Sequence, residues 1–438
     1  MESINSPIKH VMKQVFVDHW LDYLQKHINT IPDYIVNEIE KMLNCRNPEK
    51  SGYHKYACLD HPEEYTVVPH SCKSRICSVC GVNQTNKWIE EALVDFPDTG
   101  YFHVTFTIPD YLWYFFKYQS RRPLLEILFQ SAQETVMGWF LNRGIVPAAI
   151  AVLHTFGKKI NYNTHIHIVV SAGGLKKAKK NKKEKSYQGY IWKDVGKLPW
   201  GVFRKRWKAI FLKKIDKYLN CVLEEAISRK QWYIHIRSGL ANPIMACQYV
   251  GRYTKRPPMA ETRITNYDGK FVTFYYDERQ DNGWKKRERI TLHAMEFIDR
   301  LIQHIPLPQF KMIRNYGILS NVKKSKLLNI TSRLLGQTKK PLARSTWRMR
   351  QTEYLKRDPL LCKKCGKEMV LKEIAFWSKR DDKLYIKNVS LEFETTAKPR
   401  VYCTQKPFFH VLFTVFRTFL TLKTKFIFIR FNTNKSVF

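Results

Sequence analysis

The sequence predicts an α+β fold, and three observations lead to it. Residues 102–108, 161–170 and 231–238 alternate between apolar and polar side chains, as half-buried strands do. Between these stretches, apolar residues recur every three or four positions, which is typical of amphipathic helices. Cysteines gather in short spacings near the N-terminus, which indicates a small module of another kind. We therefore expect an antiparallel sheet flanked by helices, preceded by a cysteine-rich module.

The composition favours a polyanionic partner. Lysine and arginine number 75 against 38 acidic residues, a formal charge of +37 spread along all 438 residues. Such an excess is self-repelling unless a polyanion is the normal partner. Aromatic residues make up 14% of the chain and offer surfaces on which bases can stack. We therefore expect a nucleic acid as the partner.

Two other classes of protein are not expected. The N-terminus lacks the basic and apolar stretches of a secretory signal, which argues against a secreted protein with disulfides. The most apolar stretch, residues 408–431, is interrupted by four basic residues and is too short between them to span a bilayer. The sequence therefore predicts no membrane association.

The first part of the chain predicts a helical arm followed by a zinc module. Residues 1–44 repeat apolar side chains at helical spacing on both sides of a proline, so we expect two helices. Two chelating pairs follow, and each could supply two zinc ligands from one tight turn. They are a C-x2-H pair, Cys58 and His61, and a C-x2-C pair, Cys77 and Cys80. Cys72 and Cys45 are further candidates, so the set of four ligands stays open.

The middle of the chain predicts a hairpin that carries histidines. It follows a helix at 88–100, a strand at 102–108 and an aromatic-rich helix at 110–143 that Pro123 breaks or caps. Residues 149–156 and 161–170 then form two strands, joined by a loop with glycine, lysine and asparagine. Because side chains alternate along a strand, His165 and His167 share one face and can chelate one cation. His154, on the partner strand, could reach the same cation.

Basic segments follow the histidine strand. A lysine-rich run over residues 176–185 cannot pack, and it predicts a flexible loop that could clamp phosphates. Its candidate DNA-binding residues are Lys176, Lys177, Lys179 and Lys180. Residues 200–228 predict a basic amphipathic helix or a pair of helices.

A later helix carries two tyrosines. Prolines near both ends delimit it to residues 241–256. Tyr249 and Tyr253 are four positions apart, so both hydroxyl groups emerge on one helical face. Arg252 and Arg256 each follow a tyrosine by three positions, and these basic flanks make simple core burial less attractive.

The remaining elements are less informative. An Asn-Tyr-Asp-Gly turn predicts a hairpin over 262–276, and residues 291–305 predict an apolar-faced helix. Residues 320–360 are basic and weakly patterned. Cys362 and Cys365 form another C-x2-C pair with no obvious partner pair, and no element is assigned beyond about residue 385.

Taken in order, these motifs resemble the HUH superfamily of single-strand endonucleases. More narrowly, they resemble rolling-circle insertion-sequence transposases of the two-tyrosine type, which have an N-terminal zinc-binding domain. The matching stretches are residues 71–81, 103–109, 153–157, 165–167, 173–174, 249–256 and 297–306. His61, the lysine-rich insert and the tail depart from the family pattern. The residue patterns and the resemblance together predict five parts: a helical arm (1–44), a zinc-binding module (45–95), an HUH catalytic domain (96–310, with the insert near 175–186), a basic region (311–385) and an uncertain tail (386–438).

The resemblance also implies a chemistry. His165 and His167, with His154 as the candidate third ligand, would bind Mg²⁺ or Mn²⁺, and Zn²⁺ would occupy the N-terminal module. Tyr249 or Tyr253 would attack phosphorus, giving a 5′-phosphotyrosine and a free 3′-hydroxyl. The basic residues near them would ease ionisation of the phenol and hold phosphate: Arg252, Lys255 and Arg256. The substrate would be single-stranded DNA of transposon ends and target, in a bacterial cytoplasmic protein associated with the nucleoid.

Other interpretations stay open at this point. A plasmid relaxase or replication initiator would use the same chemistry on other DNA, although the zinc module and the lack of a G-x4-G-K-[ST] helicase motif favour a transposase. A catalytically inactive, zinc-dependent DNA-binding protein and an RNA-binding protein are the alternatives from other classes.

Overall fold

The fold is known here from a computed structural model. It describes residues 10–118, 121–179, 185–219, 232–254, 256–280, 284–338 and 346–389. Within these residues the chain folds as predicted, with antiparallel sheets and flanking helices in an α+β architecture. All predicted strands of the central sheet are present, and none of the described helices is long and apolar enough to cross a membrane.

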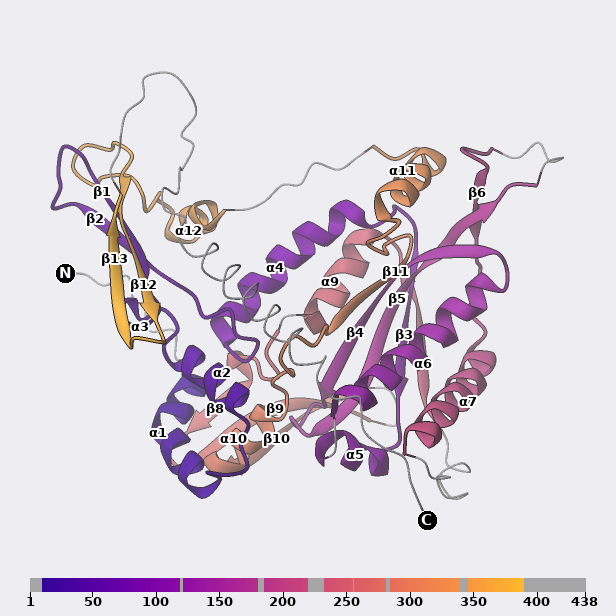
Figure 1. Cartoon of the computed structure of the whole chain (residues 1–438), viewed down its shortest axis with the longest axis horizontal. Coiled ribbons are helices and arrows are strands. Elements are labelled where there is room, and N and C mark those ends of the chain that lie inside the picture. The colour runs from indigo at the N-terminus through magenta and orange to yellow at the C-terminus, as the bar shows by residue number, and fades with distance from the viewer. Residues whose placement is uncertain are drawn as a thin grey trace, which may run out of the picture. The chain divides into compact units, whose positions relative to one another are not determined.

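The largest sheet has six antiparallel strands in the order β11-β4-β5-β3-β7, with β6 paired to β5 outside that path. The long hairpin of β4 and β5 forms its centre (Figure 1). The bounds of the strands are β3 Tyr101–Thr107, β4 Ile145–Phe156, β5 Tyr162–Lys177, β6 Tyr190–Asp194, β7 Ile234–Leu240 and β11 Ile313–Gly317.

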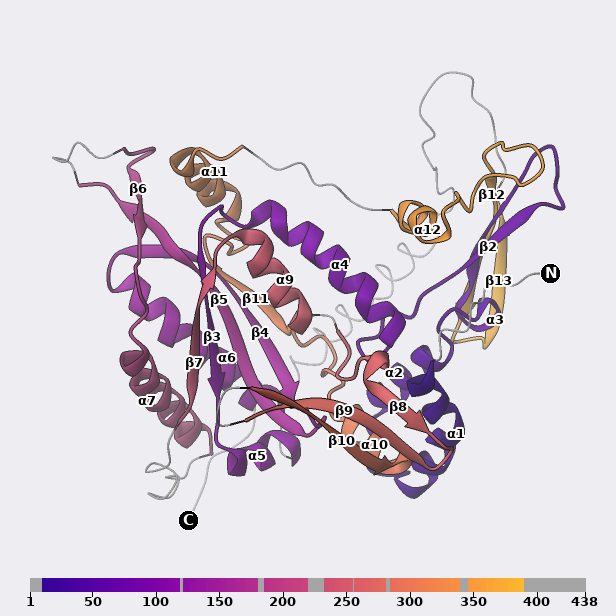
Figure 2. The ribbon, with the colours of Figure 1, turned by 180° about the vertical axis from the view of Figure 1, so that it is seen from behind.

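Helices cover both faces of this sheet. One face packs against α5 (Trp113–Tyr118), α6 (Arg121–Leu141) and α7 (Trp200–Leu219), with Phe106, Ile166 and Ile168 fully or nearly fully buried beneath them. The other face packs against α4 (Ser78–Asp95), α9 (Pro243–Thr254) and α11 (Lys324–Leu335). In Figure 2, α4 and α9 are seen in front of the sheet and α11 at its upper end. Because side chains alternate, the histidines lie on the α9 face.

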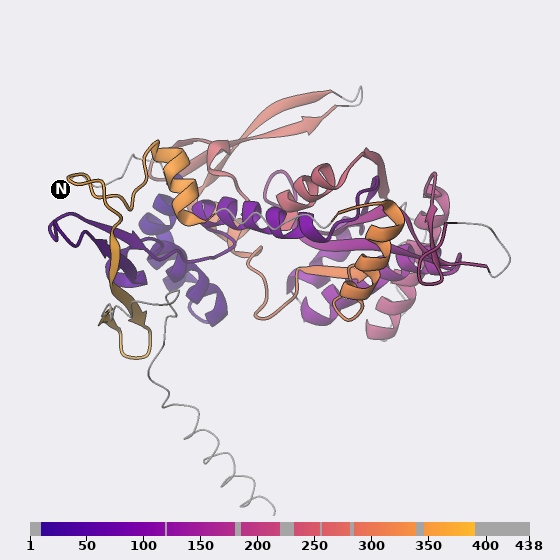
Figure 3. The ribbon, with the colours of Figure 1, turned by 90° about the horizontal axis from the view of Figure 1, so that it is seen from above.

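A second unit joins the N-terminal helices to a three-stranded sheet. Helices α1 (Val11–Lys26) and α2 (Asp33–Leu43) share a core with α10 (Ala294–Ile302) and with β8, β9 and β10. The hydroxyl of Tyr23 donates a hydrogen bond to Asp299 across 2.9 Å, tying the two helical layers together. The sheet consists of β8 (Ile264–Tyr267), β9 (Phe271–Arg279) and β10 (Lys285–His293), and its β9–β10 ribbon is clearest in Figure 3.

A third sheet combines strands from the N-terminal and C-terminal parts of the described chain. Its order is β13-β12-β1-β2, so a hairpin near residue 60 pairs with one near residue 380. The strands are β1 (Tyr53–Ala57), β2 (Tyr65–Pro69), β12 (Val370–Ser378) and β13 (Lys383–Asn388), with α3 (Pro48–Ser51) and α12 (Trp347–Leu355) nearby in sequence. Contacts therefore cross two of the expected domain boundaries, since β11 pairs with β4 and β12 with β1. The division into five domains stays a prediction.

Three local predictions were wrong in detail. Helix α4 begins at Ser78, ten residues before the predicted start, so that Cys77 is its N-cap residue and Cys80 lies in its first turn. The helix predicted over 110–143 is two helices and a 3-10 turn (Asp110–Leu112), with Pro123 in the first turn of α6, where proline is tolerated. The lysine-rich run begins within a strand, because Lys176 and Lys177 pair with β6; residues 180–184 and the tail from 390 lie outside the described residues.

A glycine fixes the attachment of β11 to the central sheet. Gly317 has φ +60°, and a Cβ atom there would overlap the carbonyl oxygen of Pro147. We expect Gly317→Ala to lower the free energy of unfolding by about 4 kcal/mol, because backbone strain and the overlap add. Gly336→Ala is the matched control, with φ +67° but no atom near the new methyl group; it should cost only about 1 kcal/mol. Chemical denaturation of both variants measures the difference, and equal losses would contradict the role of close approach.

Candidate active site and metal centres

Three histidines converge on the α9 face of the central sheet. In the β4–β5 hairpin, His154 pairs directly with His165, and His167 follows two positions along on the same face. One ring nitrogen of each residue lies within 4.8 Å of those of the other two. The ring centroid of His154 is 5.2 Å from that of His165 and 5.4 Å from that of His167. The predicted trio is therefore brought together in a form that could hold one cation.

Burial keeps these imidazoles in the form that metals bind. It lowers the pKa of His165 to about 4 and holds the pKa values of His154 and His167 well below the ordinary value. All three are neutral at physiological pH. The Nδ1–H of His165 donates to the carbonyl oxygen of Asn163 at 2.8 Å, which leaves its Nε2 unprotonated and able to bind a cation.

A fourth histidine, His103 on β3, supports the trio. Its Nε2 lies 2.9 Å from Nδ1 of His167, so the two share a hydrogen bond and a metal would be held by the other nitrogen of His167. The hydroxyl of Thr105 is 3.2 Å from the same Nδ1. Burial lowers the pKa of His103 to about 3. His103 was not predicted as a site residue, although it stands on the polar face of a predicted strand.

Helix α9 brings a tyrosine to the same face. The ring centroid of Tyr249 is 4.5 Å from that of His103, and the guanidinium of Arg237 on β7 is 5.8 Å from the Tyr249 ring. Gly251 lets α9 lie close to α4, because a Cβ there would be 2.7 Å from Ile89. Tyr249 is thus on the histidine side of the sheet. The side chains of Arg252 and Tyr253, and all of Lys255, lie outside the described residues.

An open cleft of about 610 Å³ leads to the histidines. Basic and aromatic residues from the β4–β5 loop and from the β8–β9 region line it: Lys158, Lys159, Arg263 and Tyr276. On the other side of His154, Arg75 and Arg256 line a smaller cavity with His304. Of the predicted DNA-binding residues, Arg256 therefore lies beside the histidines, whereas Lys176 and Lys177 belong to the β5–β6 hairpin and line neither cavity. Lys179 follows that strand, and Lys180 lies outside the described residues.

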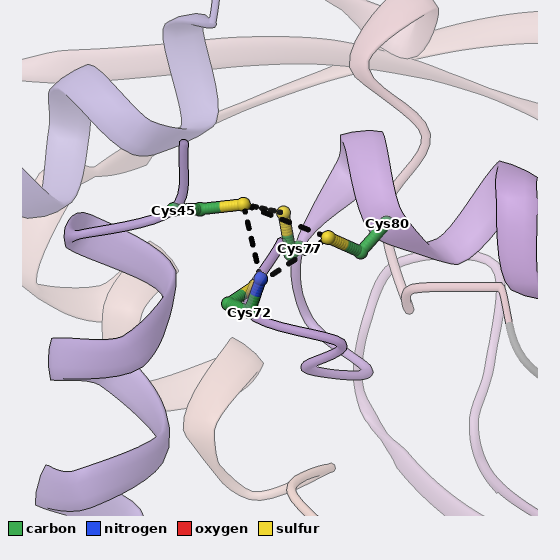
Figure 4. A group of neighbouring side chains, drawn as sticks. All are labelled: Cys45, Cys72, Cys77 and Cys80. Carbon is green, nitrogen blue, oxygen red and sulfur yellow. Dashed lines mark hydrogen bonds between the residues drawn. The ribbon is translucent and has the colours of Figure 1, made fainter. Parts of the chain in front are cut away.

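Four cysteines form a compact group at the N-terminal end of α4. Sulfur atoms of Cys45 and Cys80 are 3.5 Å apart, those of Cys72 and Cys80 are 3.6 Å apart, and those of Cys45 and Cys77 are 3.8 Å apart (Figure 4). Thiolates of a tetrahedral zinc site are separated by about 3.8 Å, given Zn–S bonds of about 2.3 Å. The group therefore has the composition and spacing of a closed structural zinc site.

This geometry corrects the predicted grouping. Cys58 and His61 were expected to complete one site with Cys77 and Cys80, but they lie in a different group, with Cys362 and Cys365. The first group is completed by Cys45 and Cys72, which the sequence offered as further candidates. The β1–β2 hairpin carries Cys58 and His61 away from α4, so the sequence neighbours are not neighbours in space.

Comparison with known proteins identifies two transposase domains in the chain. Residues 148–326 match the family model described as "Putative transposase", and residues 15–108 match the "Transposase zinc-binding domain". The chain thus carries a transposase domain and a transposase zinc-binding domain. A similar protein is the transposase for insertion sequence element IS801 of Pseudomonas savastanoi pv. phaseolicola, 29% identical over 77% of this chain and 83% of the relative. Another is the "Putative transposase y4qJ" of Sinorhizobium fredii (strain NBRC 101917 / NGR234), 27% identical over 67% and 76%. No solved structure matches the chain with significance.

The transposase is thus a DNA-cleaving and DNA-joining enzyme with a zinc-binding domain. The matched transposase domain contains the histidine hairpin, α9 and β11, and the matched zinc-binding domain contains the whole Cys45–Cys80 group. The predicted family, enzyme class and Zn²⁺ are confirmed. The roles of individual residues stay proposals.

A buried histidine, His304, supports the loop end of the β4–β5 hairpin. Nε2 of His304 lies 3.0 Å from the carbonyl oxygen of Ile160, to which it donates, and Nδ1 accepts from the hydroxyl of Thr155 at 3.1 Å. Burial lowers the pKa of His304 to about 4. Below the unfolded pKa of about 6.5, the unfolded chain takes up a proton that the folded chain does not.

We therefore expect the free energy of unfolding to fall as pH drops from about 6.5 to about 4, by about 3 kcal/mol from His304 alone. His304→Gln should remove one proton from the uptake on unfolding in this window. Denaturation curves at half-unit pH steps measure the slope. The region from pH 7 to 8 is the internal control, where this residue contributes none, and an unchanged slope in the variant would contradict burial of a neutral ring.

Proposed function

We propose that this transposase cuts and rejoins single-stranded DNA at insertion-sequence ends by transesterification onto tyrosine, in rolling-circle transposition. One observation carries the proposal: Tyr249 and His167 both contact His103, so a phenol and the cation-binding histidines share one face of the sheet. A single scissile phosphate could then meet both. A relaxase or replication initiator would need the same geometry, but both similar proteins are described as transposases.

The three neutral histidines fit a catalytic cation. His154, His165 and His167 would hold Mg²⁺ or Mn²⁺, and the all-nitrogen ligand set favours Mn²⁺, since Mg²⁺ prefers oxygen. Such an ion supplies Lewis acidity to the scissile phosphate. His103 positions His167 through the shared hydrogen bond, and Asn163 orients His165 in the same way.

The tyrosines supply the nucleophile. Tyr249 or Tyr253 attacks phosphorus, the tyrosine oxygen forms the new P–O bond, and the 3′-oxygen leaves as a hydroxyl after taking up a proton. A phenol reacts well only once it loses its proton. Arg237 places a positive charge 5.8 Å from the Tyr249 ring, where it can hold the phosphate that is attacked. The predicted helpers Arg252, Lys255 and Arg256 come from the same segment of chain. A second tyrosine would let one site hold one strand while it cuts the next.

The cleft suits a single strand. Lys158, Lys159 and Arg263 can track phosphates, and the ring of Tyr276 offers a surface on which a base can stack. Arg75 and Arg256, beside His154, would hold the phosphate on the far side of the histidines. Substrates of this kind would place the enzyme at the bacterial nucleoid.

We expect substitution of both tyrosines, Y249F with Y253F, to abolish the covalent protein–DNA adduct formed with labelled single-stranded insertion-sequence ends and Mn²⁺. Phenylalanine keeps the ring packing against His103 and removes only the attacking oxygen. The adduct is measured on denaturing gels. Y218F, on exposed Tyr218 of α7 at the opposite face, is the matched control and should keep full activity. An undiminished adduct in the double variant would show that neither Tyr249 nor Tyr253 is the nucleophile.

Loss of the supporting histidine should weaken cation binding. We expect His103→Ala to reduce Mn²⁺ affinity about 10- to 100-fold, because His167 loses the hydrogen bond that fixes its ring and tautomer. Electron paramagnetic resonance of free Mn²⁺ measures the affinity. His19→Ala, on α1, is the control and should leave the affinity near that of the wild type, because the His19 ring lies against Gly269 and Tyr267 beside the three-stranded sheet. Equal affinities in all three proteins would rule out the positioning role.

A further inference from the structure

The transposase function leaves one motif unexplained. Cys362 and Cys365 lie outside the matched zinc-binding domain, which ends at residue 108. They nevertheless lie against Cys58 and His61, about 300 residues away in sequence. Ligand atoms of all four side chains lie within 4.8 Å of one another.

We propose that these four side chains form a second structural Zn²⁺ site of three thiolates and one imidazole. The sulfurs of Cys58 and Cys365 are 3.6 Å apart. Nδ1 of His61 is 3.9 Å from the Cys58 sulfur and 3.8 Å from the Cys362 sulfur. Tetrahedral bonds of about 2.3 Å to sulfur and about 2.0 Å to nitrogen give ligand separations of about 3.5–3.8 Å. A disulfide would need sulfurs about 2 Å apart and would leave His61 without a role.

The backbone is folded around both pairs as zinc knuckles are. The N–H of Cys362 donates to the carbonyl oxygen of Lys367 at 2.9 Å, and that of Gly366 donates to Cys362 at 2.9 Å. Gly366 has φ +69°, the left-handed conformation that such a tight turn requires. In the other knuckle, the N–H of Cys58 donates to Glu64 at 3.1 Å. Both turns therefore present their ligands toward one another.

Charged side chains join the two knuckles around the ligands. Lys364 pairs with Glu63 at 2.6 Å, and Lys367 pairs with Asp60 at 2.7 Å. All four groups are exposed, so these pairs contribute little stability. They bridge the two knuckles beside the ligands.

Metal binding explains how this small sheet holds together. Its ligand end has a core of only Cys58, Cys362 and Met369, with Tyr56 packed against it. Two hairpins with so little apolar burial are marginal in water, and small modules of this kind need a metal or a disulfide. A zinc ion would fasten β12 and β13 to β1 and β2, independently of the Cys45–Cys80 group. The site therefore attaches the C-terminal hairpin to the N-terminal module.

The metal content of the purified full chain tests the site directly. Mass spectrometry of the metal should find two Zn²⁺ per wild-type chain. C362S/C365S should hold one, C58S should hold one, and the triple variant should lose no more, because all three residues serve the same ion. C247A removes a buried cysteine of α9 that belongs to neither group and should keep two ions. One ion in the wild type, or two in C362S/C365S, would overturn the proposal.

A gain-of-ligand variant keeps the test open if the serine variants fail to fold. H61C should keep two ions, because cysteine is an equally good zinc ligand at that position. In the Co²⁺-substituted protein, the wild type has four thiolate ligands in the first group and three in the second, and H61C adds an eighth. Thiolate-to-cobalt charge-transfer absorption should therefore rise by about one part in seven. Absorption unchanged from the wild type would show that residue 61 is not a ligand. Neither readout depends on DNA cleavage, so failure here leaves the proposed chemistry untouched.

Discussion

The register of three antiparallel strands governs the candidate active site. His154 pairs with His165 between β4 and β5, and Thr105 pairs with His167 between β3 and β5. Both faces of these strands are buried: Ile166 and Ile168 enter one core, while Val169 enters the other. A slip of one residue would exchange the two faces and bury imidazoles under α6. Packing on both sides therefore fixes the histidines more firmly than their own contacts do.

The Cys45–Cys80 group is connected to this site through one short loop. Residues between Cys72 and Cys77 carry Arg75, which reaches the cavity beside His154. The loop is held by local contacts, since the N–H of Ser74 donates to the sulfur of Cys72 at 3.4 Å and Lys73 takes φ +55°. Zinc in this group would fix the loop and so the position of Arg75. The zinc-binding domain thereby contributes a cationic side chain to the site, beyond any contact of its own with DNA.

The sequence predicts those parts of the site that depend on local periodicity. The histidine strand and the tyrosine helix follow from spacings of two and four, and both lie where expected. His103 was not predicted as a site residue, because a single histidine on a strand has no partner at a spacing typical of metal ligands. Its contact with His167 depends on the pairing of β3 with β5. The predicted assignment of cysteines to zinc sites was wrong, because the path of the chain decides which cysteines lie close enough to bind the same ion. Cys58 is nearer in sequence to Cys77, but a sheet assembled from distant hairpins brings it to Cys365.

Electrostatics explains why such a site is arranged for a polyanion. Burial lowers the pKa of Arg75 to about 10, which means that its charge is poorly compensated by the protein around it. Among the described residues lining the larger cleft, Glu278 is the one carboxylate, and it lies 4.0 Å from Lys159. Depressed imidazole pKa values have the same origin, because burial opposes adding positive charge here. A phosphate backbone supplies the missing negative charge. Binding DNA would therefore reduce the electrostatic repulsion and desolvation cost of the positive charges that folding brings together here.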